Sequence, residues 1–315
     1  MIRVSNLCKN FDDFCAVNNI SFSVEPGEIL GFLGPNGAGK STTMKILTGF
    51  LSPTSGEVSV MGHDVLSDAI SAQREIGYLP EGAPAYSDMT VIASLRFIGQ
   101  IRGFTGQELQ DRIDSVVSKV ELSSVLSKRV ETLSKGYCRR LGIAQSLMHD
   151  PKILILDEPT DGLDPNQKHQ VRELIRNLSA DKTVIISTHI LEEVSAVCTR
   201  AMILAEGNIV FDGTPEELAE KSESHNSVTI RLSESSDSTL VALKQLEQVK
   251  DVSIDESGLI TVYPEGSKSI LPFVNAILHK QGCLIEELHV EKGRLDDVFR
   301  QVTLSSENMN QGAAA

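Results

Sequence analysis

The nine residues from Gly34 to Thr42, Gly-Pro-Asn-Gly-Ala-Gly-Lys-Ser-Thr, constrain this chain more than any other stretch. They match the pattern G-x-x-x-x-G-K-[ST] of a phosphate-binding loop. The context also fits, because residues 28–33 have the composition of a buried strand and residues 41–47 that of a helix start. A glycine-rich turn without a ligand is the alternative, but it leaves the joint occurrence of strand, loop and helix unexplained. The pattern therefore predicts a nucleoside triphosphate site.

Each residue type in this loop has a physical role. Glycine allows the backbone to approach a phosphate closely because it has no Cβ. Successive N–H groups and the first turn of the following helix then attract the anion. The lysine can reach the β- and γ-phosphates, and the serine hydroxyl can ligate Mg²⁺. The residues expected to contact the nucleotide here are Gly34, Pro35, Asn36, Gly37, Ala38, Gly39, Lys40, Ser41 and Thr42.

The composition limits the possible partners. A length of 315 residues suggests two domains, or one large and one small. The net charge of −14 argues against nucleic acid and against direct adhesion to an anionic membrane. No apolar run approaches the length of a membrane span, residues 1–5 lack the features of a secretion signal, and the five cysteines show no metal-ligand spacing. We expect a cytoplasmic protein without direct membrane insertion, which another protein must hold at any membrane where it works.

Polar side chains follow two apolar strands. Residues 153–156 form a continuous apolar run that ends at Asp157 and Glu158, which is typical of a central parallel strand. Ligands in such sheets bind beyond the carboxyl ends of the strands, so both carboxylates are expected beside the phosphate loop. A pair of solvated acids is the alternative, but the loop favours metal and water handling. Residues 184–188 repeat the design and end at His189, which is a candidate for the same reason.

The rest of the chain has a modular pattern. Alternating short strands precede the loop, and residues of about 85–132 are mainly helical, with Leu95, Ile98 and Ile101 at helix spacing. Together with the helix that follows residue 137, they are expected to form a helical subdomain of about 85–150. Residues 222–226 are polar and suit a linker.

A second, smaller domain is expected after this linker. Residues 225–304 follow the order βαββαβ of a ferredoxin-like α+β unit, and a last helix is expected around Leu295, Val298 and Phe299. The unit contains no catalytic constellation, and its lone histidines, His279 and His289, are interpreted as structural. The tail from 305 to 315 is expected to be disordered.

The ordered set of motifs resembles the ATP-binding subunit of an ABC transporter over residues 1–222. The resemblance implies an α/β fold with a P-loop ABC ATPase core, in which a mixed sheet is joined by an antiparallel β subdomain and the helical subdomain. Residues 133–137 look like the family's signature and residues 161–164 like its D-loop. The residues that take family roles are Phe11 for adenine stacking, Ser134 and Gly136 for γ-phosphate contact, Asp164 in the D-loop, Asp157 and Glu158 in Walker B, and His189 as the switch histidine.

Two positions depart from the family pattern. Glu81 stands where the family commonly has glutamine, and it can still ligate Mg²⁺ or hold water. The signature reads Leu-Ser-Lys-Gly-Tyr rather than Leu-Ser-Gly-Gly-Gln, with Ser134 and Gly136 retained. These departures and the C-terminal addition look like the exporter class with separate permease chains, which includes drug, polysaccharide and gliding-motility systems.

The resemblance also implies a mechanism and partners. The cofactors are ATP and Mg²⁺, with the metal held by Ser41, Asp157 and Glu81, and Glu158 is the catalytic acid supported by His189 and Glu81. ATP lies between the phosphate loop of one subunit and the signature of another, so the chain is expected to form a head-to-tail homodimer. Its other partner is an integral membrane permease, which holds it at the inner face of the cell membrane.

Other functions fit less well. A DNA-repair ATPase needs coiled coils, zinc cysteines or basic faces, and a ribosome-associated factor needs two ATP domains in one chain. A regulatory module that holds ATP without turnover is disfavoured by Glu158 and His189. The ATPase of an importer is the nearest alternative, and the transported substrate is chosen by the permease.

Overall fold

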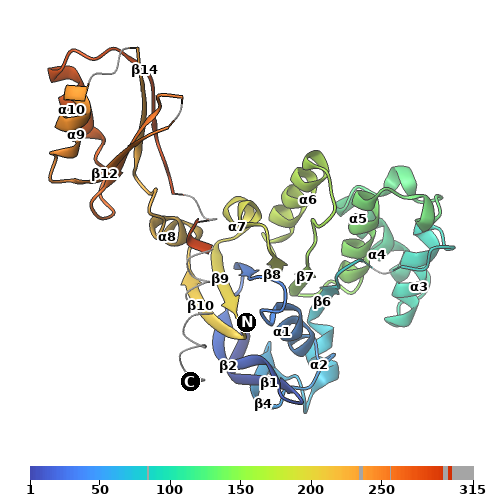
Figure 1. The fold of residues 1–315 in the computed structure, drawn as a ribbon. Coiled ribbons are helices and arrows are strands. Elements are labelled where there is room, and N and C mark those ends of the chain that lie inside the picture. The colour runs from blue at the N-terminus through green and yellow to red at the C-terminus, as the bar shows by residue number, and fades with distance from the viewer. Residues whose placement is uncertain (84, 234–236, 256, 294–296, 300–315) are drawn as a thin grey trace. The chain divides into compact units, whose positions relative to one another are not determined.

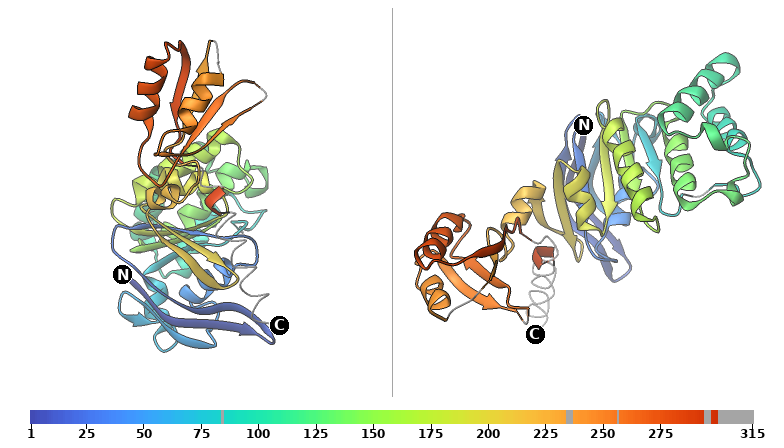
Figure 2. Two further views of the ribbon diagram at one scale, coloured as in Figure 1. Left: turned by 60° about the vertical axis from the view of Figure 1, so that its left-hand side comes forward. Right: turned by 90° about the horizontal axis from the view of Figure 1, so that it is seen from above.

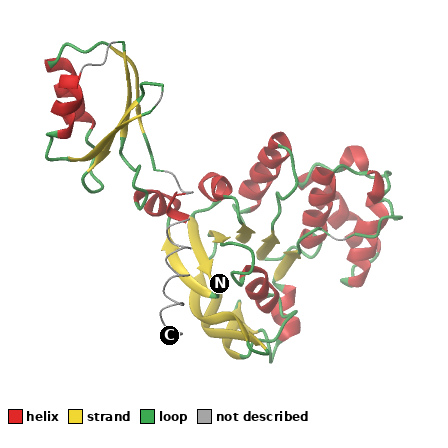
Figure 3. Cartoon of the chain, in the orientation of Figure 1, coloured by secondary structure: helices red, strands yellow, loops and turns green. Residues whose placement is uncertain are grey.

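The computed structural model describes residues 1–315 except 84, 234–236, 256, 294–296 and 300–315. Residues 1–213 form one compact unit, and the described residues from Thr214 onward form a second. Among the described residues, the first unit contains two sheets and the second contains one, and each unit has its own apolar core. Figure 1 labels the helices and strands of both units, and Figure 3 colours them by secondary structure.

A mixed sheet forms the centre of the first unit (Figure 1, Figure 2). Its strand order is β10-β9-β3-β8-β7-β6, and all neighbouring strands run parallel except β10, which is antiparallel to β9. The predicted central position of the strand that ends at Asp157 is confirmed. The strands are β3 (Ile29–Leu33), β6 (Ile76–Leu79), β7 (Ile153–Asp157), β8 (Thr183–Thr188), β9 (Arg200–Ala205) and β10 (Asn208–Gly213).

Both faces of this sheet are covered, so every residue of its central strands β3, β7 and β8 is buried. Successive side chains of a strand point to opposite faces. Ile153 and Ile155 of β7 accordingly join one apolar cluster, and Leu154 and Leu156 join the other. The parallel register aligns Asp157 with Ser187, so the carboxyl ends of β7 and β8 meet at one edge.

An antiparallel sheet and a short helix cover one face. The sheet has the order β2-β1-β4-β5, and helix α1 contributes Met44, Ile46 and Leu47 to the core between the two sheets. These elements, with a short neighbouring helix, are β1 (Ile2–Phe11), β2 (Phe14–Val24), β4 (Ser55–Val60), β5 (His63–Asp64), α1 (Lys40–Leu47) and α2 (Ala69–Arg74).

Helices contribute to the core on the other face, and the helical insert predicted from residue 85 onward is confirmed. Leu95 of the insert is fully buried, but Ile101 is 64% exposed. Ile101 ends a helix, as its spacing predicts, but its side chain lines an open groove rather than the core. The elements are α3 (Val91–Ile101), α4 (Gly106–Lys119), α5 (Lys135–Leu147), α6 (Pro165–Leu178), α7 (Leu191–Val197) and two 3-10 turns, Ser123–Val125 and Val130–Thr132.

The second unit is an α+β fold with the element order βαββαβ after a first helix. Its antiparallel sheet has the strand order β12-β13-β11-β14. Alternate residues such as Val228 and Ile230 are buried against two helices. The elements are α8 (Pro215–Glu220), β11 (Val228–Leu232), α9 (Asp237–Lys244), β12 (Val249–Ile254), β13 (Ile260–Pro264), α10 (Leu271–Lys280) and β14 (Ile285–Val290).

The boundary between the units falls at Gly213, before the polar stretch that the sequence suggests as a linker. Residues 222–226 pair with the end of the second unit instead. The Asn226 N–H donates to Glu291 O at 2.9 Å, and the His225 ring contacts Lys292 O at 2.9 Å. Of the expected last helix, residues 297–299 are helical and Leu295 lies outside the described residues, as does the tail 305–315.

Among the residues that the structure describes, no helix is long and apolar enough to span a membrane.

Candidate nucleotide-binding and catalytic site

The phosphate loop joins the end of β3 to the start of α1. Gly39 has φ +100°, and a Cβ at this position would lie 2.4 Å from Ala16 O, so only glycine fits. The Lys40 ammonium folds back on the loop and donates to Gly34 O at 2.6 Å and to Pro35 O at 3.1 Å. The loop is therefore closed around its own lysine, which lies where an incoming phosphate would need it.

Lys40 lies close to three carboxylates. Burial lowers the pKa of Lys40, and the nearby charges of Glu158, Asp157 and Glu81 act in the opposite direction. Because these acids come from the ends of β7 and β6, the sheet brings them to the phosphate loop as the strand patterns suggest.

A cavity of about 200 Å³ lies over the loop. The Phe11 side chain is 44% exposed at its rim, with Lys9 Nζ 4.9 Å from the ring centroid. Phe14, 60% exposed, lines the same cavity and was not predicted. The signal was present, because two phenylalanines bracket the turn between β1 and β2. The lining residues are Phe11, Phe14, Ala16, Pro35, Asn36, Gly37, Ala38, Gly39, Lys40, Ser41, Thr42, Glu81 and Glu158.

Ser187 of β8 ties the Asp157 carboxylate and the Glu158 backbone to the neighbouring strand. Asp157 is only 2% exposed, and its Oδ1 accepts a hydrogen bond from the Ser187 hydroxyl. The same hydroxyl oxygen accepts from the Glu158 N–H at 3.0 Å. Glu158 has φ +48°, a conformation that non-glycine residues rarely adopt. The serine thus fixes the backbone of Glu158 while it satisfies the buried Asp157.

The Glu158 side chain contacts His189 from the end of β8. Glu158 Oε2 lies 3.0 Å from His189 Nδ1, with the histidine half exposed and the carboxylate 14% exposed. Burial raises the pKa of Glu158, and the hydrogen bond and charge of His189 and the charge of Lys40 oppose that rise. A carboxylate whose pKa lies above the usual range is a better proton acceptor near neutral pH.

Ser134 and Gly136 lie elsewhere. Ser134 caps α5, and its Oγ accepts from the Tyr137 N–H at 3.4 Å. Gly136 packs tightly on α6, because a Cβ there would be 3.0 Å from Gln167 Cδ. Both residues line a second cavity of about 280 Å³, the signature cavity. It shares no lining residue with the cavity over the phosphate loop, the loop cavity. In a single chain, Ser134 and Gly136 therefore lie in a different cavity from the phosphate loop.

The comparison with known proteins identifies the family. Residues 17–161 match the family model described as ABC transporter. The chain is 32% identical over 305 residues to the linearmycin resistance ATP-binding protein LnrL of Bacillus subtilis (strain 168), covering 96% of this chain and 98% of that protein. It belongs to the ABC transporter ATP-binding proteins. It is therefore an ATP-binding and ATP-hydrolysing subunit of an ABC transporter.

Other members of the family agree. The ABC transporter ATP-binding protein YxlF of Bacillus subtilis (strain 168), itself described as uncharacterized, is 39% identical over 225 residues, covering 71% of this chain and 75% of that protein. Among solved structures, cbiO1 from Clostridium perfringens, described as part of the ABC transporter complex cbiONQ, superposes with a TM-score of 0.65. It is 28% identical to this chain, with 70% of this chain and 90% of that one covered.

Asp164 of this ABC ATPase lies at the start of α6. Its carboxylate accepts a hydrogen bond from the Gln167 N–H at 2.9 Å and caps the helix. Asp164 is not among the residues that line either cavity. The structure therefore shows a capping role for a residue that the sequence assigns to nucleotide contact.

The residues predicted to hold Mg²⁺ supply a hydroxyl and two carboxylates. Ser41 and Glu81 line the cavity over the phosphate loop, and the buried Asp157 is near enough for its charge to act on Lys40. Among the described residues, no three His, Cys, Asp or Glu side chains come together as a metal site. The hydroxyl of Ser41 and the carboxylates of Glu81 and Asp157 suit Mg²⁺, which binds through one or two carboxylates together with the phosphates of a nucleotide.

Proposed function

We propose that this chain is the ATPase of an exporter, and that two copies close head-to-tail around two ATP molecules. The separation of the two cavities carries the proposal, because the phosphate loop and Ser134 belong to different halves of a site. Ser134 begins helix α5, and the N-terminus of a helix attracts a phosphate. A second copy can bring that helix end to the nucleotide, which a single copy does not.

The residues of the site divide the work of hydrolysis. Lys40 leaves the carbonyls of Gly34 and Pro35 and binds the β- and γ-phosphates of ATP. Glu158, held in place by Ser187, accepts a proton from the attacking water, and His189 orients that carboxylate. When bound, Mg²⁺ neutralises part of the charge on the phosphates.

Glu81 and Phe11 complete the proposed site. Glu81 replaces the family's glutamine as a ligand of Mg²⁺ or water at the edge of the cavity. Phe11 stacks on the adenine, and Phe14 lines the same cavity beside it.

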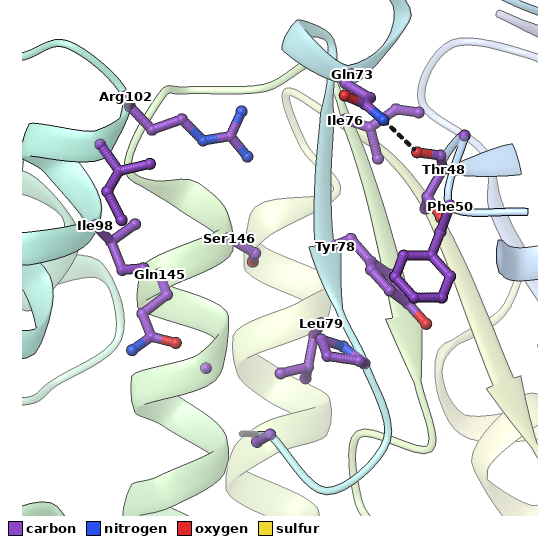
Figure 4. A pocket seen from close by; sticks show the side chains of 15 residues that line it. Thr48, Phe50, Gln73, Ile76, Tyr78, Leu79, Ile98, Arg102, Gln145 and Ser146 are labelled. Atoms are coloured by element: carbon purple, nitrogen blue, oxygen red, sulfur yellow. Dashed lines mark hydrogen bonds between the residues drawn. The ribbon is translucent and has the colours of Figure 1, made fainter. Parts of the chain in front are cut away.

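A groove of about 740 Å³ supports the permease as a partner. Figure 4 shows its walls, with Ile98 and Arg102 on one side, Phe50 and Gln73 on the other, and Tyr78 between them. Phe50 is 78% exposed, and exposed apolar side chains along a groove are typical of a protein interaction site. The groove borders Pro80, directly before Glu81. A permease helix seated here can therefore move with the nucleotide site, and it holds the chain at the inner face of the cell membrane.

Relatives support the proposed direction of transport. The chain resembles proteins named for linearmycin resistance and for Nod factor export, the latter 35% identical over 219 residues in Cupriavidus metallidurans. The second name describes export, and the first describes resistance to a compound, which export of that compound would provide. The similarity to LnrL extends over nearly the whole chain, including the second unit.

Complementation between two disabled chains tests the head-to-tail site. Lys40→Ala removes the phosphate-loop lysine, and Ser134→Arg blocks the signature cavity, so each homodimer loses both of its sites. In a mixed dimer, the intact loop of one chain faces the intact signature of the other. With Glu158→Gln in both chains to prevent turnover, differently tagged chains should co-purify with ATP only when the two variants are mixed.

The trapped chain without further substitutions is the positive control, and the same mixture without ATP is the negative control. If the control pairs with ATP and the mixture does not, the head-to-tail arrangement is refuted.

A further inference from the structure

The buried carboxylate of Glu193, on α7, connects the loop that follows Glu158 to the end of β8. The Glu193 side chain is only 6% exposed. Its Oε1 accepts a hydrogen bond from the Thr160 hydroxyl, and its Oε2 accepts one from the Thr188 hydroxyl at 2.8 Å. Arg172 Nη2 of α6 lies 3.8 Å from Oε1. A buried carboxylate needs such partners, and it fixes the groups that supply them.

The two threonines belong to the segments that carry the candidate catalytic groups. Thr160 follows Glu158 by two positions and begins the loop that reaches Asp164. Thr188 directly precedes His189, and its hydroxyl also accepts the Ile190 N–H at 3.0 Å. The Thr188 side chain therefore fixes the backbone on both sides of the histidine.

We propose that Glu193 is a positioning residue that keeps Glu158 and His189 in register by holding Thr160 and Thr188 on one carboxylate. A shift of the loop after Glu158 is then transmitted to His189, and the reverse also holds. The inference rests on the proposed roles of Glu158 and His189. It assigns Glu193 no contact with ATP, because the residue lines neither the loop cavity nor the signature cavity.

Substitutions chosen from these contacts can distinguish a positioning role of Glu193 from a contribution to the stability of the fold. Glu193→Gln preserves the side-chain volume and one acceptor oxygen, but its amide NH₂ cannot accept the second hydroxyl. One threonine is thereby released while the packing stays. Thr160→Val and Thr188→Val release each end in turn, and Thr160→Ser and Thr188→Ser retain the hydroxyls. Glu192→Gln, on the exposed side of the same helix, is the matched control.

The test measures kcat, KM for ATP, MgATP binding and thermal unfolding of the full-length chain. Displacement of a catalytic group by about 1 Å can cost on the order of 100-fold in rate, so Glu193→Gln and both valine variants should lose about 10- to 100-fold in kcat. KM should change by less than about twofold, because the phosphate loop is untouched. The two serine variants and Glu192→Gln should stay near the wild-type rate.

The kcat of a double variant distinguishes a link between the two threonines from two independent contributions to the fold. If one carboxylate links the two threonines, removal of either end breaks the link. Thr160→Val combined with Thr188→Val should then be no slower than the slower single variant. Multiplied losses, or a fall of kcat only in proportion to lost ATP binding and lost folded protein, would overturn the proposal.

Glu158→Gln in the same assay distinguishes a failure of the proposed catalytic site from a failure of the proposed role of Glu193. Near-normal turnover of Glu158→Gln would refute the catalytic role of Glu158, on which the role of Glu193 rests. A slow Glu158→Gln beside a normal Glu193→Gln leaves the site in place and refutes only the positioning role.

Discussion

Replacement of His189 by alanine should move the pH dependence of ATP hydrolysis to higher pH. Burial raises the pKa of Glu158, and the hydrogen bond from His189 opposes that rise. His189→Ala removes this opposition, so the pKa of Glu158 rises further. A general base works in its ionised form, so the rate increases as pH rises through this pKa. The acid limb of the kcat profile should therefore shift upward in the variant.

The size of the shift follows from the contact between Glu158 and His189. A hydrogen bond to a charged group contributes about 1.5–3 kcal/mol, and about 1.4 kcal/mol corresponds to one pKa unit. The His189 side chain is 49% exposed, so solvent screens the interaction and reduces that figure substantially. We expect an upward shift of about 0.5–1 pH unit.

The assay is kcat at saturating MgATP across the acid and neutral range, for wild type, His189→Ala and Glu158→Gln. His189→Ala also lowers the maximum rate, so the midpoint of the limb is the readout rather than its height. Glu158→Gln is the control, because its residual activity should lack this limb. A limb that stays in place or moves to lower pH in His189→Ala refutes the reasoning, as does a limb that persists in Glu158→Gln.

Three further predictions concern the site, the second unit and the groove. Glu158→Gln should bind MgATP but hydrolyse it at least ~100-fold more slowly. It should also unfold at a higher temperature than wild type at neutral pH. Burial raises the pKa of Glu158, so the wild-type protein loses stability as pH rises through this raised pKa and the carboxyl group ionises. The neutral glutamine avoids this loss, and the difference between the two unfolding temperatures should vanish in acid. An unchanged rate contradicts the first expectation and an unchanged unfolding temperature the second. A chain that ends at Glu223 should still bind ATP, because the residues lining the loop cavity all precede Gly213; a folded chain that fails to bind would show that the second unit completes the site. Ile101→Asp, at a 64% exposed position of the groove, should reduce the permease co-purified from membranes while ATP binding persists, whereas Leu284→Asp, 73% exposed in the second unit, should not; equal recovery with both variants removes the groove as the permease site.

Local sequence pattern predicted the elements that carry the site. The apolar runs before Asp157 and His189 indicated parallel strands, and the shared edge of such strands explains why Glu158 and His189 meet. The phosphate loop was readable because its chemistry is contained in one contiguous segment. These features depend on short-range order along the chain, which a single sequence records directly.

Contacts between residues far apart in the sequence were not predictable in this way. Ser187 bonds to Asp157 across 30 positions, and Glu193 bonds to Thr160 across 33. Ser187 and Glu193 look like ordinary polar residues until strand register, for Ser187, and the packing of α7, for Glu193, bring their partners to them. The exposure of Ile101 was not predictable for a related reason, because helix spacing indicates an apolar face but not whether a core or a groove lies against it.

The bonds of Lys40 to the carbonyls of Gly34 and Pro35 affect how substitutions at this position are interpreted. Nucleotide binding at this lysine is an exchange of partners, so the measured affinity is the strength of its phosphate contacts minus that of the two bonds it gives up. Lys40→Ala removes the proposed phosphate contact and also the two hydrogen bonds that hold the loop closed around this side chain. The affinity lost in such a variant therefore combines a missing charge with a relaxed loop, and it overstates what the ammonium contributes to holding ATP.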